Sequence, residues 1–419
     1  MFNLIKKLKP NLGKYNPGQL VDLLEDAEVA AKLEAASEPE YLYYDQLTEV
    51  PDGMEREKFW ALVKVSRKYA SRPLPPINFN ERPFTLSNLF AHNELFYKLD
   101  NNMIRGLANN KEEAASAVID EAIYSAIIDD PQIKYSKVKR MLLENTPANN
   151  EAEELAKRAY KFYKTLLHSK KLTEEIILEF SSQNRFRSDD EEERFVRSPK
   201  DNSMVCYIAP SLRIFEPELK RFIAFANDEL EQNFLHPLAK AILLHFWALI
   251  LKPLPQNNAV FARAIQYWYL QKAGRSNFML PVSAQIKSDL AGYSNAISCA
   301  AQDDNDYTYF QDYILRKLIE CSKAHEKSRA KHDDFENNML PLLQRDSTLN
   351  HRQVKLIYDL CKSRERRTNF SAYMAGNAIT RKTAADDLKE MERGGYLKSQ
   401  KLGRNIFYYA GPKAAGLFS

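Results

Sequence analysis

The feature that most constrains this chain is a pair of apolar stretches separated by a short polar loop. Residues 239–251 contain only two polar side chains, which predicts a helix buried on nearly all sides. Residues 259–273 predict a second helix, closed by Gly274. A loop held between rigid elements is a common place for chemistry, so segment 252–263 becomes the candidate site.

Composition predicts a mainly α-helical protein of two or three domains. The chain has 419 residues, of which 44% are hydrophobic, 28% are charged and only 12 are glycines. No apolar run is long enough to cross a bilayer, and the first residues lack the apolar run of a secretory signal. The four cysteines are scattered, as reduced thiols in a cytosol would be. We therefore expect a cytoplasmic location and no membrane contact.

Element signals divide the body into regions. We expect an N-terminal helical region over 1–105, a helical core over 106–330 and a linker over 331–344. Within the core, 112–130 predicts a helix ended by Pro131, with Ser125 and Asp129 on roughly one face. Two short β-type runs around a turn-rich segment predict a hairpin over 195–208, the only sheet that the sequence indicates in the body.

Residues 345–419 have the element order of a winged helix, an α+β module. This segment holds 15 Lys or Arg against 7 Asp or Glu, a net charge of about +8 in a chain whose total is +4. The third helix of such a module lies in the DNA major groove, and its wing meets phosphates. The predicted DNA contacts are Arg381, Lys382, Lys398, Lys401 and Arg404. Winged helices also bind proteins, so a target protein is the alternative partner.

The loop itself can be considered as bare chemistry. Asn258 is expected to cap the following helix, whose free amides would attract an anion. If Lys252 and Arg263 point inward, two cations flank that helix start and would stabilise a phosphate. In the plainer interpretation, Lys252 is solvated, Arg263 pairs with an acid and Asn258 only caps the helix.

The order of these motifs resembles the Fic family, whose signature reads HxFx(D/E)GNGRxxR. The matching stretch is 236–263, with His245 seven residues before Lys252 as an early histidine. Segment 306–310, Asp-Tyr-Thr-Tyr-Phe, resembles the family's D-x-T-x-F helix start. The hairpin resembles the flap, placed at 193–210, that positions a target segment. Segment 125–130 resembles the autoinhibitory (S/T)xxxE(G/N) helix.

The resemblance implies a helical bundle with one β-hairpin flap and an activity that transfers AMP from ATP to a Ser, Thr or Tyr hydroxyl. In the family the motif histidine is the general base, the acidic residue holds magnesium, and the first arginine grips the phosphates. The inhibitory glutamate pairs with the final arginine. A bacterial protein that binds ATP and forms a homodimer is the expectation that follows.

This chain departs from the signature at most of these positions. The base position is Lys252, which is ordinarily protonated at neutral pH, and the metal position is Gln256, a poor magnesium ligand. The glycine positions are Asn257 and Ala259, and the first arginine is replaced by Val260. Pro253, Asn258 and Arg263 match the signature, and the inhibitory glutamate is shortened to Asp129.

Two classes of function therefore compete. The first is a catalytically silent regulator that binds a nucleotide or phosphate through Asn257, Asn258 and Arg263 and carries a DNA-binding winged helix. The second is an active protein adenylyltransferase with Lys252 as an atypical catalytic residue. Lys252 and Gln256 favour the first class, for which ATP is the expected ligand and magnesium is not.

Overall fold

The structure is a computed structural model. It describes residues 3–4, 7, 10, 12–79, 82–87, 89–103, 111–230, 235–274, 280–345, 349–362, 367–377, 379–402 and 405–415. The chain forms two compact units, Met1–Ser322 and Lys323–Ser419. The protein is mainly helical with small sheets, as composition predicts. None of the described helices is both long and apolar enough to cross a bilayer.

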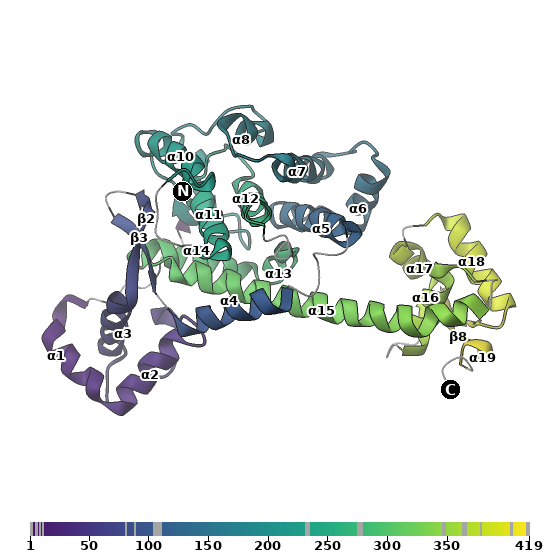
Figure 1. The fold of residues 1–419 in the computed structure, drawn as a ribbon, viewed down its shortest axis with the longest axis horizontal. Coiled ribbons are helices and arrows are strands. Elements are labelled where there is room, and N and C mark those ends of the chain that lie inside the picture. Colours follow the sequence, from purple (N-terminus) through teal and green to yellow (C-terminus); the bar gives the residue numbers. More distant parts are fainter. Residues whose placement is uncertain are drawn as a thin grey trace. The chain divides into compact units, whose positions relative to one another are not determined.

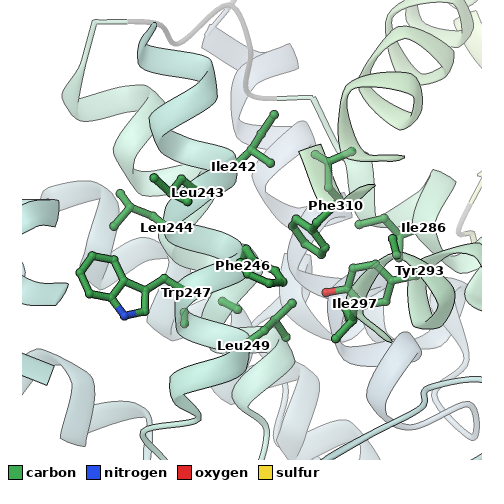
Figure 2. Close-up of a cluster of buried hydrophobic side chains, with 14 of the residues drawn as sticks. Ile242, Leu243, Leu244, Phe246, Trp247, Leu249, Ile286, Tyr293, Ile297 and Phe310 are labelled. Carbon is green, nitrogen blue, oxygen red and sulfur yellow. The ribbon is translucent and has the colours of Figure 1, made fainter. Parts of the chain in front are cut away.

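Two buried helices form the centre of the first unit. They are α11, Pro237–Leu251, and α12, Asn258–Lys272, and nearly every residue of both is buried. Figure 1 shows α10 on one side of this pair and α5 with α7 on the other. In Figure 2, Phe246 of α11 faces Phe310 and Tyr293, while Trp247 points to the opposite side of the helix. Apolar side chains around the whole circumference of α11 explain why it is enclosed.

The remaining helices of the first unit surround this pair. Their bounds are η1 Leu12–Lys14, α1 Pro17–Val21, η2 Asp22–Glu25, α2 Ala27–Ser37, η3 Tyr44–Gln46, α3 Arg56–Ala70, α4 Phe90–Met103, α5 Lys111–Asp129, α6 Tyr135–Glu144, α7 Glu151–His168, α8 Glu174–Phe180, α9 Glu191–Arg194, α10 Leu212–Ala226, α13 Val282–Ser288, α14 Leu290–Gln302 and α15 Thr308–Arg345. The helix expected at 112–130 is α5, which ends just before Pro131.

The first unit contains more sheet than the sequence indicated. The expected hairpin is present as β4, Phe195–Arg197, and β5, Met204–Ile208, and β1, Asn3–Leu4, adds to it beside β5 in parallel. A second hairpin, β2 Ser71–Phe79 and β3 Arg82–Ser87, was not predicted. Both strands contain prolines, which argue against strands when only the sequence is considered. The pairing register is interrupted between Leu74 and Asn78, and both strands lie at the edges of a two-stranded sheet. Edge strands and irregular pairing tolerate proline.

The start of α15 binds the N-terminal region to the core. Asp306 accepts hydrogen bonds from the Thr308 backbone amide at 3.1 Å and from the Tyr41 hydroxyl at 2.6 Å. Thr308 Oγ1 in turn accepts a hydrogen bond from the Ser87 amide at 2.9 Å. The D-x-T-x-F segment is thus a helix start, as predicted. These buried contacts explain why residues 1–105 are not a separate compact unit.

The segment expected to be a linker, 331–344, is helical throughout and belongs to α15. The unit boundary at 322/323 lies inside this same helix. Segment 331–344 was read as a linker because it is rich in polar residues. Polar residues do not end a helix, the segment contains no glycine, and α15 continues through Pro341 to Arg345.

The second unit has helices and strands in the order expected for a winged helix. They are α16 His351–Lys362, β6 Arg367–Asn369, α17 Phe370–Asn377, α18 Arg381–Arg393, β7 Leu397–Leu402, β8 Asn405–Ala410 and α19 Pro412–Ala415. The sheet order is β6-β8-β7. Thr380 caps α18, whose buried face includes Ala384, Leu388 and Met391. Asp387 accepts a hydrogen bond from Tyr373 on α17 at 2.9 Å.

Candidate functional site

Two non-glycine residues with left-handed backbone conformation frame the loop between α11 and α12. Lys252 caps α11 with φ 49°, and its amide donates to the Ala248 carbonyl. Asn257 precedes α12 with φ 59°. Asparagine tolerates this region better than most residues, which explains how the loop turns where the Fic signature has glycine.

The predicted cap at Asn258 is wrong. Asn257 occupies the N-cap position, and Asn258 is the first residue of α12. The Asn258 side chain turns back across the loop: Oδ1 accepts from the Leu254 amide at 2.8 Å, and Nδ2 donates to the Leu254 carbonyl at 2.6 Å. Both polar ends of this buried amide are therefore used in closing the loop. Asn258 therefore shapes the loop through both the oxygen and the nitrogen of its side-chain amide.

Lys252 points toward the segment that enters the flap. Its Nζ donates to the Glu193 carbonyl at 2.6 Å, two residues before β4 begins. Burial, and after it the positive charges of Arg187 and Arg197, lower the pKa of Lys252 to about 8. The plainer expectation of a solvated lysine is therefore wrong: Lys252 is partly buried and links the motif loop to the flap.

Arg187 is a loop contact that the sequence did not reveal. Its backbone amide donates to the Pro253 carbonyl at 2.9 Å, and Nη1 donates to the Ser188 carbonyl at 3.1 Å. The guanidinium lies 4.6 Å from the Phe215 ring centroid. Burial lowers the pKa of Arg187 to about 10. A single arginine before the flap carried no sequence signal, because its role depends on folding against the loop.

Arg263 is the most deeply buried cation of the site. Its Nε donates to Ser125 Oγ at 2.8 Å, and Nη2 donates to the Ser125 carbonyl at 2.9 Å and to Asp129 Oδ1 at 2.8 Å. Nη1 is buried without a hydrogen-bond partner. Burial acts to lower the pKa of Arg263, but Asp129 and nearby tyrosine hydroxyls raise it above its ordinary value. Arg263 is therefore a permanent cation held by the helix expected to be inhibitory.

Asp129 places a carboxylate against the beginning of α12. Burial raises the pKa of Asp129, while Arg263 and the backbone amide of Val260 in the first turn of α12 act to lower it. Amides at a helix start and an arginine are the groups that would bind a phosphate. The chain thus supplies its own anion where the sequence predicted an external one. Arg263 therefore pairs with an acid, as the plainer interpretation of the sequence predicts.

His245, the early histidine, is a buried packing residue. Its Nδ1 donates to Gln266 Oε1 at 2.7 Å, and its Nε2 accepts from the Tyr293 hydroxyl at 2.8 Å. Burial, together with the charge of Arg263, lowers the pKa of His245 to about 3, so the ring is neutral. Gln266 and Tyr293 were missed, since nothing in their spacing indicates a shared partner.

The metal position of the signature has no ligand suited to magnesium. Gln256 is exposed and carries a neutral amide, whereas magnesium prefers carboxylates. In the part of the chain that the structure describes, no group of three His, Cys, Asp or Glu side chains could hold a metal ion. We derive no step that uses magnesium.

The proposed DNA contacts lie on two elements of the second unit. Arg381 and Lys382 are exposed in the first turn of α18, and Lys398 and Lys401 are exposed on β7. Arg404 lies outside the described residues. In winged helices that bind DNA, the first turn of the recognition helix approaches base edges in the groove.

We predict that Lys252 titrates with a midpoint near pH 8 in the folded chain. The rate of acetylation by acetic anhydride, followed at this residue by mass spectrometry across pH, measures that midpoint. In denaturant the midpoint should return to about 10.4, the value of an unburied lysine. A folded-state midpoint above about 10 would contradict the burial that we assign to the amine.

Because the pKa of Lys252 is lower in the folded chain than in the unfolded chain, the free energy of unfolding depends on pH. Between about pH 8 and pH 10.5 the unfolded chain binds more protons at Lys252 than the folded chain does. The penalty for burying the charged amine is therefore full below pH 8 and disappears as pH rises to 10.5. Urea unfolding should show the wild-type chain gaining stability relative to Lys252→Met across this window.

Comparison with known proteins gives matches at the level of structure. No family model matches the sequence, and no curated protein matches it. A Fic family protein from Desulfovibrio desulfuricans G20 is 15% identical, with a TM-score of 0.48, over 78% of this chain and 97% of its own. A Fic domain containing signaling protein from Bacteroides thetaiotaomicron VPI-5482 is 18% identical, with a TM-score of 0.40, over 56% of this chain and 98% of its own. Each of these two proteins is a Fic family protein or contains a Fic domain.

Proposed function

We propose that this chain is a Fic-type regulator that binds a nucleotide or phosphate without transferring AMP and that carries a DNA-binding winged helix. The observation that carries the proposal is the position of Asp129. Its carboxylate accepts from Arg263 Nη2 at 2.8 Å and is stabilised by the nearby Val260 amide, and an arginine and a helix-start amide are the two kinds of donor that a phosphate would use. A ligand phosphate competes with Asp129 for these donors.

The chemistry at the remaining motif positions supports binding rather than transfer. Transfer of AMP needs a base for the target hydroxyl and stabilisation of the charge that develops on the phosphates. At neutral pH most Lys252 side chains are protonated, and Nζ donates to the Glu193 carbonyl. Gln256 supplies no negative charge for a metal. A charged Lys252 can instead attract an anion toward the loop.

An active adenylyltransferase is the second candidate, and the lowered pKa of Lys252 favours it. With a pKa of about 8, roughly a tenth of the side chains are neutral at pH 7. A neutral lysine can accept a hydroxyl proton once its hydrogen bond to Glu193 is broken. This candidate predicts activity that increases from pH 7 to pH 9.

We predict that Asp129→Asn tightens ATP binding by about tenfold, which corresponds to about 1.4 kcal/mol. The substitution keeps the shape of the side chain and removes the charge that competes with the phosphates. Isothermal titration calorimetry with ATP, without added metal, measures the change. Asp130→Asn is the matched control, because this neighbouring carboxylate instead accepts from the Gln132 amide at 3.0 Å.

An ATP affinity in Asp129→Asn that equals or falls below the wild-type affinity would refute a phosphate site at the start of α12. Equal tightening in Asp130→Asn would refute the specific role of Asp129, because the effect would then reflect total charge. A thermal melt of each variant confirms that the fold is retained.

For the second unit, we predict that Arg381→Ala and Lys382→Ala weaken binding to duplex DNA. The second unit includes the basic segment 345–419, and α18 exposes these two cations in its first turn. A gel-shift series at increasing salt measures the affinity and its salt slope, which should fall by about one for each phosphate contact removed. Lys389→Ala, which removes an exposed charge further along α18, is the matched control.

Failure of the wild-type chain to shift random duplex at low salt would count against DNA as the partner. Equal weakening in all three variants would show that only total charge matters. In that case the first turn of α18 would not be a specific DNA contact.

A further inference from the structure

A second concave site lies in the first unit, away from the motif loop. A cavity of about 860 Å³ is bordered by α6, α7 and α8, and no residue of 252–263 lines it. Figure 1 shows these helices beyond α12 from α11. Its volume is within the range of about 300–1,000 Å³ that is typical of small-molecule sites.

One face of α7 makes this cavity basic. Lys157, Arg158, Lys161 and Lys164 line it at helical spacing, so that they project to the same side. None of the four has a carboxylate within ion-pair distance in the described part of the chain, although Glu154 and Glu179 also border the cavity. With these two carboxylates included, about two positive charges remain in excess.

Nearby lysines outside the cavity do have partners. Lys137 contacts Glu153 at 2.5 Å, and Lys171 contacts Glu229 at 2.8 Å. Carboxylates on this surface therefore pair with some lysines, whereas none of the four cavity cations has such a partner among the described residues. Four cations on one wall repel one another, a cost that an anion would remove.

Arg158 carries the strongest indication of a missing anion. Its Nε is buried and has no hydrogen-bond partner, and its guanidinium lies 6.0 Å from the Phe180 ring centroid. Burial lowers the pKa of Arg158, and the charge of Glu154 only partly opposes this. A guanidinium Nε that loses water without gaining an acceptor is costly, unless a ligand supplies the acceptor.

The rest of the lining is suited to the body of a ligand. Met141 and Leu142 of α6, together with Phe162 and Tyr160 of α7, provide apolar and aromatic surface. We propose that this cavity binds a small phosphorylated molecule, with its phosphates on Arg158 and Lys161 and its apolar part against α6. Phosphate suits the wall because several charges converge there and arginine binds phosphate oxygens in pairs.

The test uses the full chain and inorganic tripolyphosphate in isothermal titration calorimetry. We expect Arg158→Gln and Lys161→Gln each to weaken binding by about tenfold, since each removes a charge-assisted contact. Lys170→Gln is the matched control, because this exposed lysine follows α7 and does not line the cavity. Lys161 is exposed, so its variant should fold even if Arg158→Gln does not.

The α12 site could also bind tripolyphosphate, so one variant separates the two. Asp129→Asn, which is expected to tighten phosphate binding at α12, should leave the tripolyphosphate binding that depends on Arg158 unchanged. If Lys170→Gln weakens binding as much as Lys161→Gln, or if Asp129→Asn tightens binding while Arg158→Gln and Lys161→Gln leave it unchanged, the proposal is overturned. Binding of a single-stranded oligonucleotide without binding of tripolyphosphate would also overturn it, in favour of a nucleic-acid surface.

Discussion

The arrangement of the site depends on one buried cation, the guanidinium of Arg263. It projects from α12 and holds Ser125 and Asp129 of α5, so two helices distant in sequence are fixed against each other. A charge this deep is tolerated only when its partners are in place, and removal of one partner of a buried pair typically costs about 3–5 kcal/mol. The same contact therefore stabilises the fold and occupies the phosphate-binding donors.

Under the proposed function, this double role explains how the site keeps its form without AMP transfer. If Arg263 served only a ligand, loss of the reaction would leave an unpaired buried charge. Because Asp129 completes the pair within the chain, the loop frame made by Asn258 and Lys252 can persist as structure. Binding of an external phosphate then becomes an exchange between two anions, which suits a regulator better than an enzyme that must turn over.

The sequence allowed the helical frame to be predicted because its signals are local. Apolar stretches located α11 and α12, the element order of 345–419 located α18, and Pro131 marked the end of α5. Contacts between side chains far apart in the chain could not be predicted. Lys252 donates a hydrogen bond to the Glu193 carbonyl, and the Tyr293 hydroxyl donates one to His245. Both bonds join residues that only the folded chain brings together. The role predicted for Asn258 was wrong because an asparagine near a helix start can either cap the helix or close the preceding loop.

The central claim is that the loop binds phosphate and does not transfer AMP. The most direct measurement incubates the purified full chain and a bacterial lysate with ATP labelled at the α-phosphate, in the presence of manganese or magnesium. Label on protein is then compared between the wild-type chain and Lys252→Ala. We predict that neither transfers label above background. Strong labelling by the wild-type chain that disappears in Lys252→Ala would contradict the account and establish Lys252 as a catalytic residue.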